Sequence, residues 1–154
     1  MTTTLNGKTL TTHEATARLA AVLERLPTLT SHGMGLVPSK ATRTLAKDAR
    51  ARAYAEEHAY LLSRGEMFHA VCRWLEPIPR NKTANPGLSS YFLKHIAEDC
   101  LGEYILNGVF IAAAVHSGFC YKLYPDSPNV GFGISRQSLR DALKRANVQR
   151  RWIF

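Results

Sequence analysis

The chain has 154 residues, of which 45% are apolar and 21% are charged. These proportions exclude a disordered chain, and the length favours one domain with a single core. The 20 Lys and Arg residues outnumber the 12 Asp and Glu residues, so the formal net charge is +8. Such an excess favours an anionic partner, most simply nucleic acid.

The cysteine pattern and the hydropathy point to the compartment. Cys72, Cys100 and Cys120 lie in apolar surroundings without the CxxC spacing of a metal or redox site, so we expect reduced core thiols. The chain does not open on a basic stretch followed by an apolar one, and its longest apolar run, residues 109–115, is too short to span a bilayer. We therefore expect a cytoplasmic protein and no membrane partner.

The N-terminal region predicts a hairpin followed by a helix. Residues 2–5 and 8–11 flank Asn-Gly, the dipeptide that supplies positive φ angles to a two-residue turn. Thr11 precedes Glu14 at the spacing of a capping box, and apolar residues then recur at helical spacing, which predicts a helix over residues 12–26. The next segment, residues 27–39, has two glycines and two prolines and predicts a loop.

A basic stripe follows. At 100° per residue, the side chains of Lys40, Arg43, Lys47 and Arg50 fall within an arc of about 80°, with small and apolar residues on the other side. The pattern predicts one amphipathic helix that Gly65 ends or bends. Its basic face is either ordinary solvent-exposed surface or a surface that follows a phosphate backbone.

Three more helices are expected before the second hairpin. An apolar face before Pro77 predicts the first, and residues 76–90, with three prolines, predict the longest loop. Ser89 or Ser90 can cap the second, which Gly102 ends. The third is a short apolar helix over residues 109–117, for which Asn107 is the predicted cap.

The C-terminal region predicts a hairpin and a last helix. Residues 119–124 and 130–134 flank a Pro-Asp-Ser-Pro-Asn segment, which is typical of a hairpin with a longer loop. The last helix, over residues 135–148, has a basic side and an apolar side. The apolar side consists of Leu139, Ala142, Leu143 and Ala146. The predicted fold is α+β: a mainly helical single domain with an N-terminal and a C-terminal β-hairpin.

One block of residues resembles a known pattern. It reads Lys94-His95-x-x-Glu98, then Tyr104-x-x-Asn107-Gly108-x-Phe110-Ile111-x-Ala113-Ala114-x-x-x-Gly118-Phe119, and then Pro128-Asn129. The block is similar to one found in small uncharacterised bacterial proteins, which are often carried on phages, plasmids or genomic islands. The resemblance covers about residues 89–134. It implies a bacterial or mobile-element origin and assigns no activity.

The order helix, turn, helix, hairpin over residues 90–134 also fits a winged helix-turn-helix. Two features argue against it. The helix that would read DNA, residues 108–117, has almost no side chain able to bind base edges, and the connection before it is longer than the usual three or four residues. We therefore expect this helix to be buried.

Titratable residues offer no clear catalytic or metal site. His95 and Glu98 are one helical turn apart, and His116 precedes Cys120 by four residues, but a zinc site needs a set of N and S ligands that these scattered residues do not form. We expect no metal and no cofactor, a half-buried His95, and a Glu98 paired with Lys94. Whether His95, Glu98 and His116 form a site stays open. Without a recognisable catalytic motif, we expect a binding protein and not an enzyme.

Aromatic residues on the second hairpin allow two interpretations. Tyr121, Tyr124 and Phe132 could form a stacking platform for nucleic-acid bases. The alternation of Tyr121 and Leu123, with Phe132 and Ile134, favours instead the core face of a half-buried hairpin.

The sequence thus predicts a nucleic-acid-associated protein that holds the phosphate backbone of DNA or RNA on basic helices, alone or as a basic subunit of a nucleoprotein complex. The alternative is a phage or plasmid accessory protein that binds and inhibits a host defence or regulatory protein, such as an anti-CRISPR or anti-restriction protein. The apolar residues Trp152, Ile153 and Phe154 are expected to dock on the domain or bind a partner protein. The candidate nucleic-acid-binding residues are Lys40, Arg43, Lys47, Arg50, Arg136, Arg140, Lys144, Arg145, Arg150 and Arg151.

Overall fold

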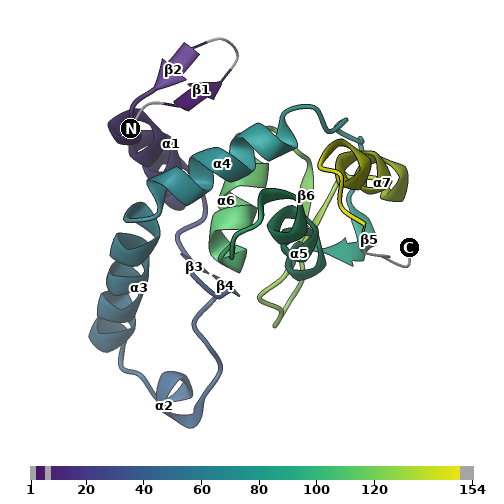
Figure 1. Ribbon diagram of the computed structural model, residues 1–154. Coiled ribbons are helices and arrows are strands. Elements are labelled where there is room, and N and C mark those ends of the chain that lie inside the picture. The colour runs from purple at the N-terminus through teal and green to yellow at the C-terminus, as the bar shows by residue number, and fades with distance from the viewer. Residues whose placement is uncertain (1–2, 6–7, 150–154) are drawn as a thin grey trace.

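The computed structural model of the chain describes residues 3–5 and 8–149 (Figure 1). Its helices are α1 (Thr12–Arg25), α2 (Lys40–Arg43), α3 (Lys47–Leu62), α4 (Gly65–Leu75), α5 (Ser90–Leu101), α6 (Asn107–His116) and α7 (Arg136–Arg145). Its strands are β1 (Thr3–Leu5), β2 (Lys8–Leu10), β3 (Leu29–Thr30), β4 (Gly33–Met34), β5 (Asn85–Ser89), β6 (Tyr121–Leu123) and β7 (Val130–Phe132). The predicted α+β class with its mainly helical content is confirmed. Within the described part of the chain, no helix combines the length and the apolar character needed to cross a bilayer.

Helix α6 is the centre of the core. Every residue from Asn107 to Val115 is buried, and the helix packs against α1, α4 and α5 (Figure 1). A helix that is apolar on all sides is stable only when other elements surround it. The prediction that this helix is buried is confirmed.

The second hairpin is part of a three-stranded antiparallel sheet in the order β5-β7-β6. The predicted pairing of β6 with β7 is confirmed, but the prediction of a loop over residues 76–90 was wrong at its end, where β5 forms. Pro86 and Gly87 disfavour a strand, so the sequence does not predict β5. The strand can still form because it lies at the edge of the sheet, where its pairing with β7 is irregular between Asn85 and Ser89.

At the N-terminus the hairpin β1–β2 and helix α1 confirm the prediction. The Thr11 side chain accepts a hydrogen bond from the Glu14 N–H, and the Glu14 carboxylate accepts one from the Thr11 N–H, which completes the capping box. The predicted loop over residues 27–39 was wrong in part, because it contains the short hairpin β3–β4. The buried Thr30 hydroxyl stabilises this hairpin by donating to the carbonyl oxygens of Gly33 and Gly35.

The single helix predicted from Lys40 to Gly65 was also wrong. The chain leaves the helix after Arg43 and re-enters it at Lys47, so the four basic residues lie on two helices. The Thr44 hydroxyl donates to the carbonyl oxygens of Lys40 and Ala41, the first two residues of α2. This local bond offers the backbone an alternative to continuing the helix.

The remaining helix ends follow the predicted chemistry with one exception. Ser89 caps α5, and Gly102, with a φ of 73°, ends it in the left-handed conformation that glycine adopts without strain. In α7 the predicted apolar side is buried except for Ala146, which follows the helix and is exposed. The exception is Asn107, which lies inside α6 and does not cap it.

Candidate functional site

The predicted basic residues form two groups at opposite ends of the molecule. One group lies on α2 and α3, the other lies on α7, and the core separates them (Figure 1). Each group is therefore a separate candidate site. Arg150 and Arg151, and the apolar Trp152, Ile153 and Phe154, lie outside the described residues.

The first group lies on a segment that extends away from the core. This segment, residues 36–62, is here called the arm (Figure 1). Helix α2 buries no residue and α3 buries only Leu61. Helix α3 is rich in alanine, the residue with the highest intrinsic helix propensity, so it depends little on packing. The arm thus holds Lys40, Arg43 and Lys47 exposed, and Arg50 half-buried.

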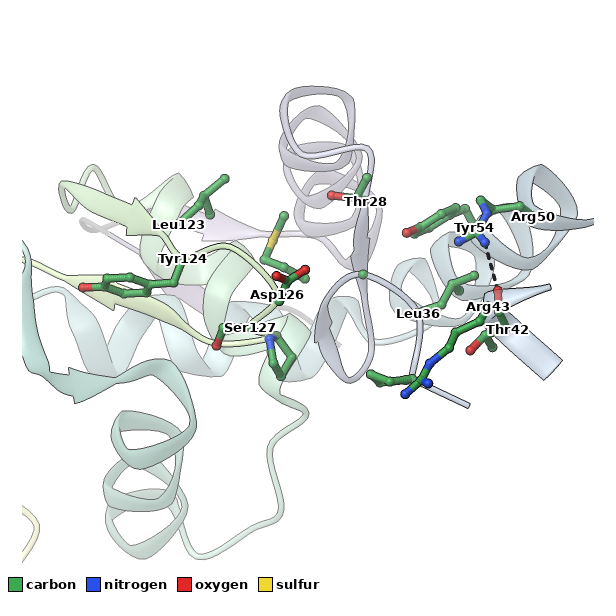
Figure 2. A pocket seen from close by; sticks show the side chains of 14 residues that line it. Thr28, Leu36, Thr42, Arg43, Arg50, Tyr54, Leu123, Tyr124, Asp126 and Ser127 are labelled. Carbon is green, nitrogen blue, oxygen red and sulfur yellow. Dashed lines mark hydrogen bonds between the residues drawn. The ribbon is translucent and has the colours of Figure 1, made fainter. Parts of the chain in front are cut away.

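A groove, here called the arm groove, separates the arm from the turn between β6 and β7 (Figure 2). It is open to solvent and has a volume of about 840 Å³. One wall comes from the arm, with Leu36, Thr42, Arg43, Arg50 and Tyr54, and the other comes from the turn, with Leu123, Tyr124, Asp126 and Ser127. The β3–β4 region, which directly precedes the arm, completes the lining with Thr28, Met34 and Gly35. The groove therefore joins two segments that are far apart in the sequence, residues 28–54 and 123–128.

The arm wall of the groove is cationic. The Arg50 guanidinium donates a hydrogen bond of 2.9 Å to the Thr42 carbonyl oxygen, which orients it beside α2. Lys40, Arg43, Lys47 and Arg50 form no ion pair with an acidic side chain in the described residues. An anionic ligand would therefore gain Coulomb energy at this wall without breaking an internal ion pair.

The turn wall is aromatic, aliphatic and acidic. Tyr124 lies against Gly131, where a Cβ atom would come within 2.8 Å of the Tyr124 hydroxyl oxygen. Asp126 is exposed and has a φ of 58°, a left-handed conformation that Asp adopts more readily than most residues. Leu123, predicted to face the core, is instead 46% exposed and lines the groove, because β6 is an edge strand and its end lies beyond the core. Phe132 and Ile134 are buried as predicted.

The second basic group lies on the outer face of α7, opposite the buried Leu139 and Leu143. Its members are Arg136, Arg140, Lys144 and Arg145, all exposed. Arg136 lies over Gly87 of β5, where a Cβ atom would come within 3.0 Å of its guanidinium. Arg140 donates a hydrogen bond of 3.3 Å to the Gln137 side chain. Two of these four side chains thus have contacts within the protein.

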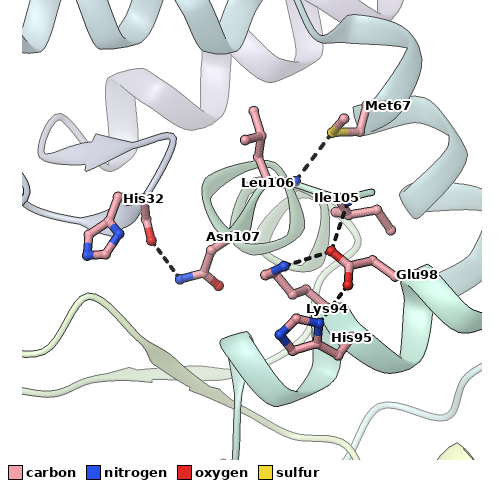
Figure 3. Close-up of polar contacts among 8 residues, drawn as sticks. All are labelled: His32, Met67, Lys94, His95, Glu98, Ile105, Leu106 and Asn107. Atoms are coloured by element: carbon pink, nitrogen blue, oxygen red, sulfur yellow. Dashed lines mark hydrogen bonds and ion pairs between the residues drawn. The ribbon is translucent and has the colours of Figure 1, made fainter. Parts of the chain in front are cut away.

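Glu98 is the centre of a polar cluster that joins α5 to the segment before α6 (Figure 3). The Lys94 Nζ atom lies 2.7 Å from Glu98 Oε1, and the His95 Nδ1 atom lies 2.6 Å from Glu98 Oε2. Glu98 Oε1 also accepts a hydrogen bond of 3.0 Å from the Ile105 N–H. The predicted pairing of Glu98 with Lys94 and the hydrogen-bonded, half-buried His95 are confirmed.

The Lys94 ammonium is deeply buried, since the residue is only 3% exposed. It lies 5.2 Å from the ring centroid of Tyr91 and 4.8 Å from that of Tyr104, two tyrosines with exposed outer faces. Burial raises the pKa of Glu98, but the bonds from Lys94, Ile105 and His95 outweigh it and hold that pKa below its ordinary value of 4.5. Glu98 is therefore ionised at neutral pH and compensates the buried ammonium.

The Asn107 side chain is hydrogen-bonded to two loops and is not the helix cap that was predicted (Figure 3). This pair of hydrogen bonds is here called the Asn107 clamp. Its Nδ2 atom donates to the His32 carbonyl oxygen at 2.9 Å and to Asn129 Oδ1 at 3.1 Å. Gly108 continues the contact, because its N–H donates to the Ser31 carbonyl oxygen. The Asn-Gly and Pro-Asn parts of the sequence block thus meet at the β3–β4 hairpin.

Two other titratable groups, His116 and Cys72, also have shifted pKa values. Burial lowers the pKa of His116, and the positive charges of Arg18 and Arg25 lower it further. Burial raises the pKa of Cys72 to about 12, so this thiol stays protonated. Across residues 3–5 and 8–149, no three or more His, Cys, Asp or Glu side chains gather into a cluster that could hold a metal ion.

Sequence reasoning found Arg43 and Arg50, and named Tyr124 as a possible stacking residue, but missed the other polar residues of the groove. Tyr54 could have been found, since it follows Arg50 by one helical turn and shares its face. Asp126 could not, because only the tertiary fold brings the β6–β7 turn opposite the arm. No protein-family model matches the chain, and no curated protein or solved structure matches it either.

Proposed function

We propose that the protein binds the phosphate backbone of nucleic acid through the cations of the arm. The observation that carries the proposal is that four cations of the arm, Lys40, Arg43, Lys47 and Arg50, form no ion pair with an acidic side chain in the described residues, and that Arg43 and Arg50 line a groove. Clustered, uncompensated Lys and Arg residues attract a polyanion and displace its condensed counterions. The buried α6 supports backbone contacts over base reading in a DNA major groove.

The salt dependence of binding tests this proposal. Fluorescence anisotropy with labelled DNA and RNA should give a dissociation constant that rises steeply from about 50 to 200 mM salt. The triple variant K40Q/R43Q/K47Q should lower the slope of log K against log salt by about 2 to 3, because each lost phosphate contact removes about 0.7 to 0.9. Arg50 is left in place because it bonds to the backbone of α2.

A matched variant on α7 locates the site. R136Q/K144Q/R145Q removes the same number of charges, so it controls for net charge, and it should change the slope much less than the arm variant. A larger effect of the α7 variant would move the site to the other end of the molecule. Absence of binding by the wild type at low salt would refute nucleic-acid binding, and an acidic protein partner would then be the explanation of the arm cations to pursue.

A further inference from the structure

We infer that the arm groove takes a single strand of nucleic acid, with phosphates on the arm wall and a base against the β6–β7 turn, where Asp126 favours guanine. The inference rests on the proposed function and deepens it. Three features of the groove support it: its shape, the opposite charges of its two walls, and the hydrogen bonds that the Asp126 carboxylate can accept.

The shape of the groove favours one strand over a duplex. Its volume of about 840 Å³ lies within the range of sites that enclose a small ligand. Readers of duplex DNA insert a convex element, such as a helix, into the major groove, whereas proteins that bind single strands hold them in a cationic groove beside aromatic rings. Here Arg43 and Arg50 line a concave wall, and Tyr54 lines the same groove (Figure 2).

The two walls differ in charge. Arg43 and Arg50 attract phosphates to the arm wall, and the Asp126 carboxylate repels them from the turn wall. A strand in the groove would therefore have its backbone beside the arm and its bases toward the turn. The exposed side chain of Leu123 offers apolar contact to a base there.

Asp126 would then select among bases. A carboxylate accepts hydrogen bonds at both oxygens and donates none when ionised. Guanine presents two adjacent N–H donors on its Watson–Crick edge, whereas thymine and uracil present one N–H between two carbonyl oxygens that a carboxylate repels. The Asp126 carboxylate makes no hydrogen bond or ion pair with the described residues, so both oxygens are available.

The test measures anisotropy with labelled 12-nucleotide probes at low salt: alternating TG and oligo-T in DNA, alternating UG and oligo-U in RNA, and a 12-base-pair duplex. The wild type should bind the G-containing strands at least about 5-fold tighter than the matched T or U strands, the lower end of a bidentate base contact. D126N keeps a residue that tolerates the left-handed backbone, and it should lose this preference while binding oligo-T or oligo-U more tightly.

D141N on α7 is the matched control, because it removes the same charge away from the groove and should leave the preference intact. Equal base preference in D126N and wild type would overturn the role of Asp126. A duplex bound as tightly as the single strands would overturn the inference and leave the proposed function standing. Failure of the wild type to bind every probe would overturn both.

Discussion

The buried ion pair at Glu98 allows a quantitative test of the structure. In Glu98→Gln the amide oxygen can still accept from Ile105, but Lys94 loses its counter-ion in a site where it is 3% exposed. Two charges 2.7 Å apart attract each other by about 6 kcal/mol at an effective dielectric constant of about 20. Because desolvation offsets part of this, removing one partner of a buried pair costs about 3 to 5 kcal/mol. For a chain of this size, the melting temperature should fall by about 6 to 20 °C.

Calorimetry at pH 7 measures this shift, and two comparisons isolate its cause. The double variant K94M/E98Q removes both charges and should recover most of the lost stability, since apolar replacement of a buried pair is often neutral. The folded pKa of Glu98 lies below 4.5, so its contribution is present above that pH and is lost as the pH falls through the folded pKa. The difference between E98Q and wild type should therefore shrink in acid. A double variant no more stable than E98Q at pH 7 would refute the reasoning.

Three further changes test the packing and the titration. Gly108→Ala should destabilise the protein by about 1 to 3 kcal/mol or more in urea unfolding, because its Cβ atom would overlap the Thr30 carbonyl oxygen, which is backbone and cannot move aside. Phe110→Ala should cost about 3 to 5 kcal/mol by leaving a cavity in the centre of the core, and normal stability would contradict the buried position of α6. The lowered pKa of His116 means that the unfolded state binds the proton first, so stability should fall as the pH drops below about 6.5, and His116→Gln should flatten that dependence.

The parts of the fold that the sequence predicted are those encoded by local chemistry. The capping box at Thr11, the left-handed Gly102 and the alternating faces of α7 each depend on residues within one or two turns of each other. The burial of α6 was also predictable, because an apolar helix with no polar face requires surrounding elements. These signals act within a segment and do not need the tertiary structure.

The predictions of secondary structure were wrong where a contact with a distant part of the chain determines the local structure. Residues 29–34 form a hairpin whose Ser31 N–H donates to Glu57, which is 26 residues away. Strand β5 forms because it pairs with β7, although Pro86 and Gly87 disfavour a strand. For the candidate site, the composition of the arm identified its cations, but the wall that faces them comes from a turn more than 70 residues later in the chain, between β6 and β7.

The Asn107 clamp links the two walls of the arm groove. Its two hydrogen bonds join the β3–β4 hairpin, which leads into the arm, to Asn129 at the end of the opposite wall, and the Met34 N–H donates to the Pro128 carbonyl oxygen across the same junction. Asn107→Ala should therefore lower the free energy of unfolding by about 1 to 3 kcal/mol, because it removes two part-buried hydrogen bonds of about 0.5 to 1.5 kcal/mol each. It should also weaken nucleic-acid binding at temperatures where the variant is fully folded, because the groove walls lose their common attachment. Phe110→Ala is the control, since it destabilises the core without contributing to either wall. Equal affinities of the two folded variants would show that the clamp stabilises the fold without setting the width of the groove.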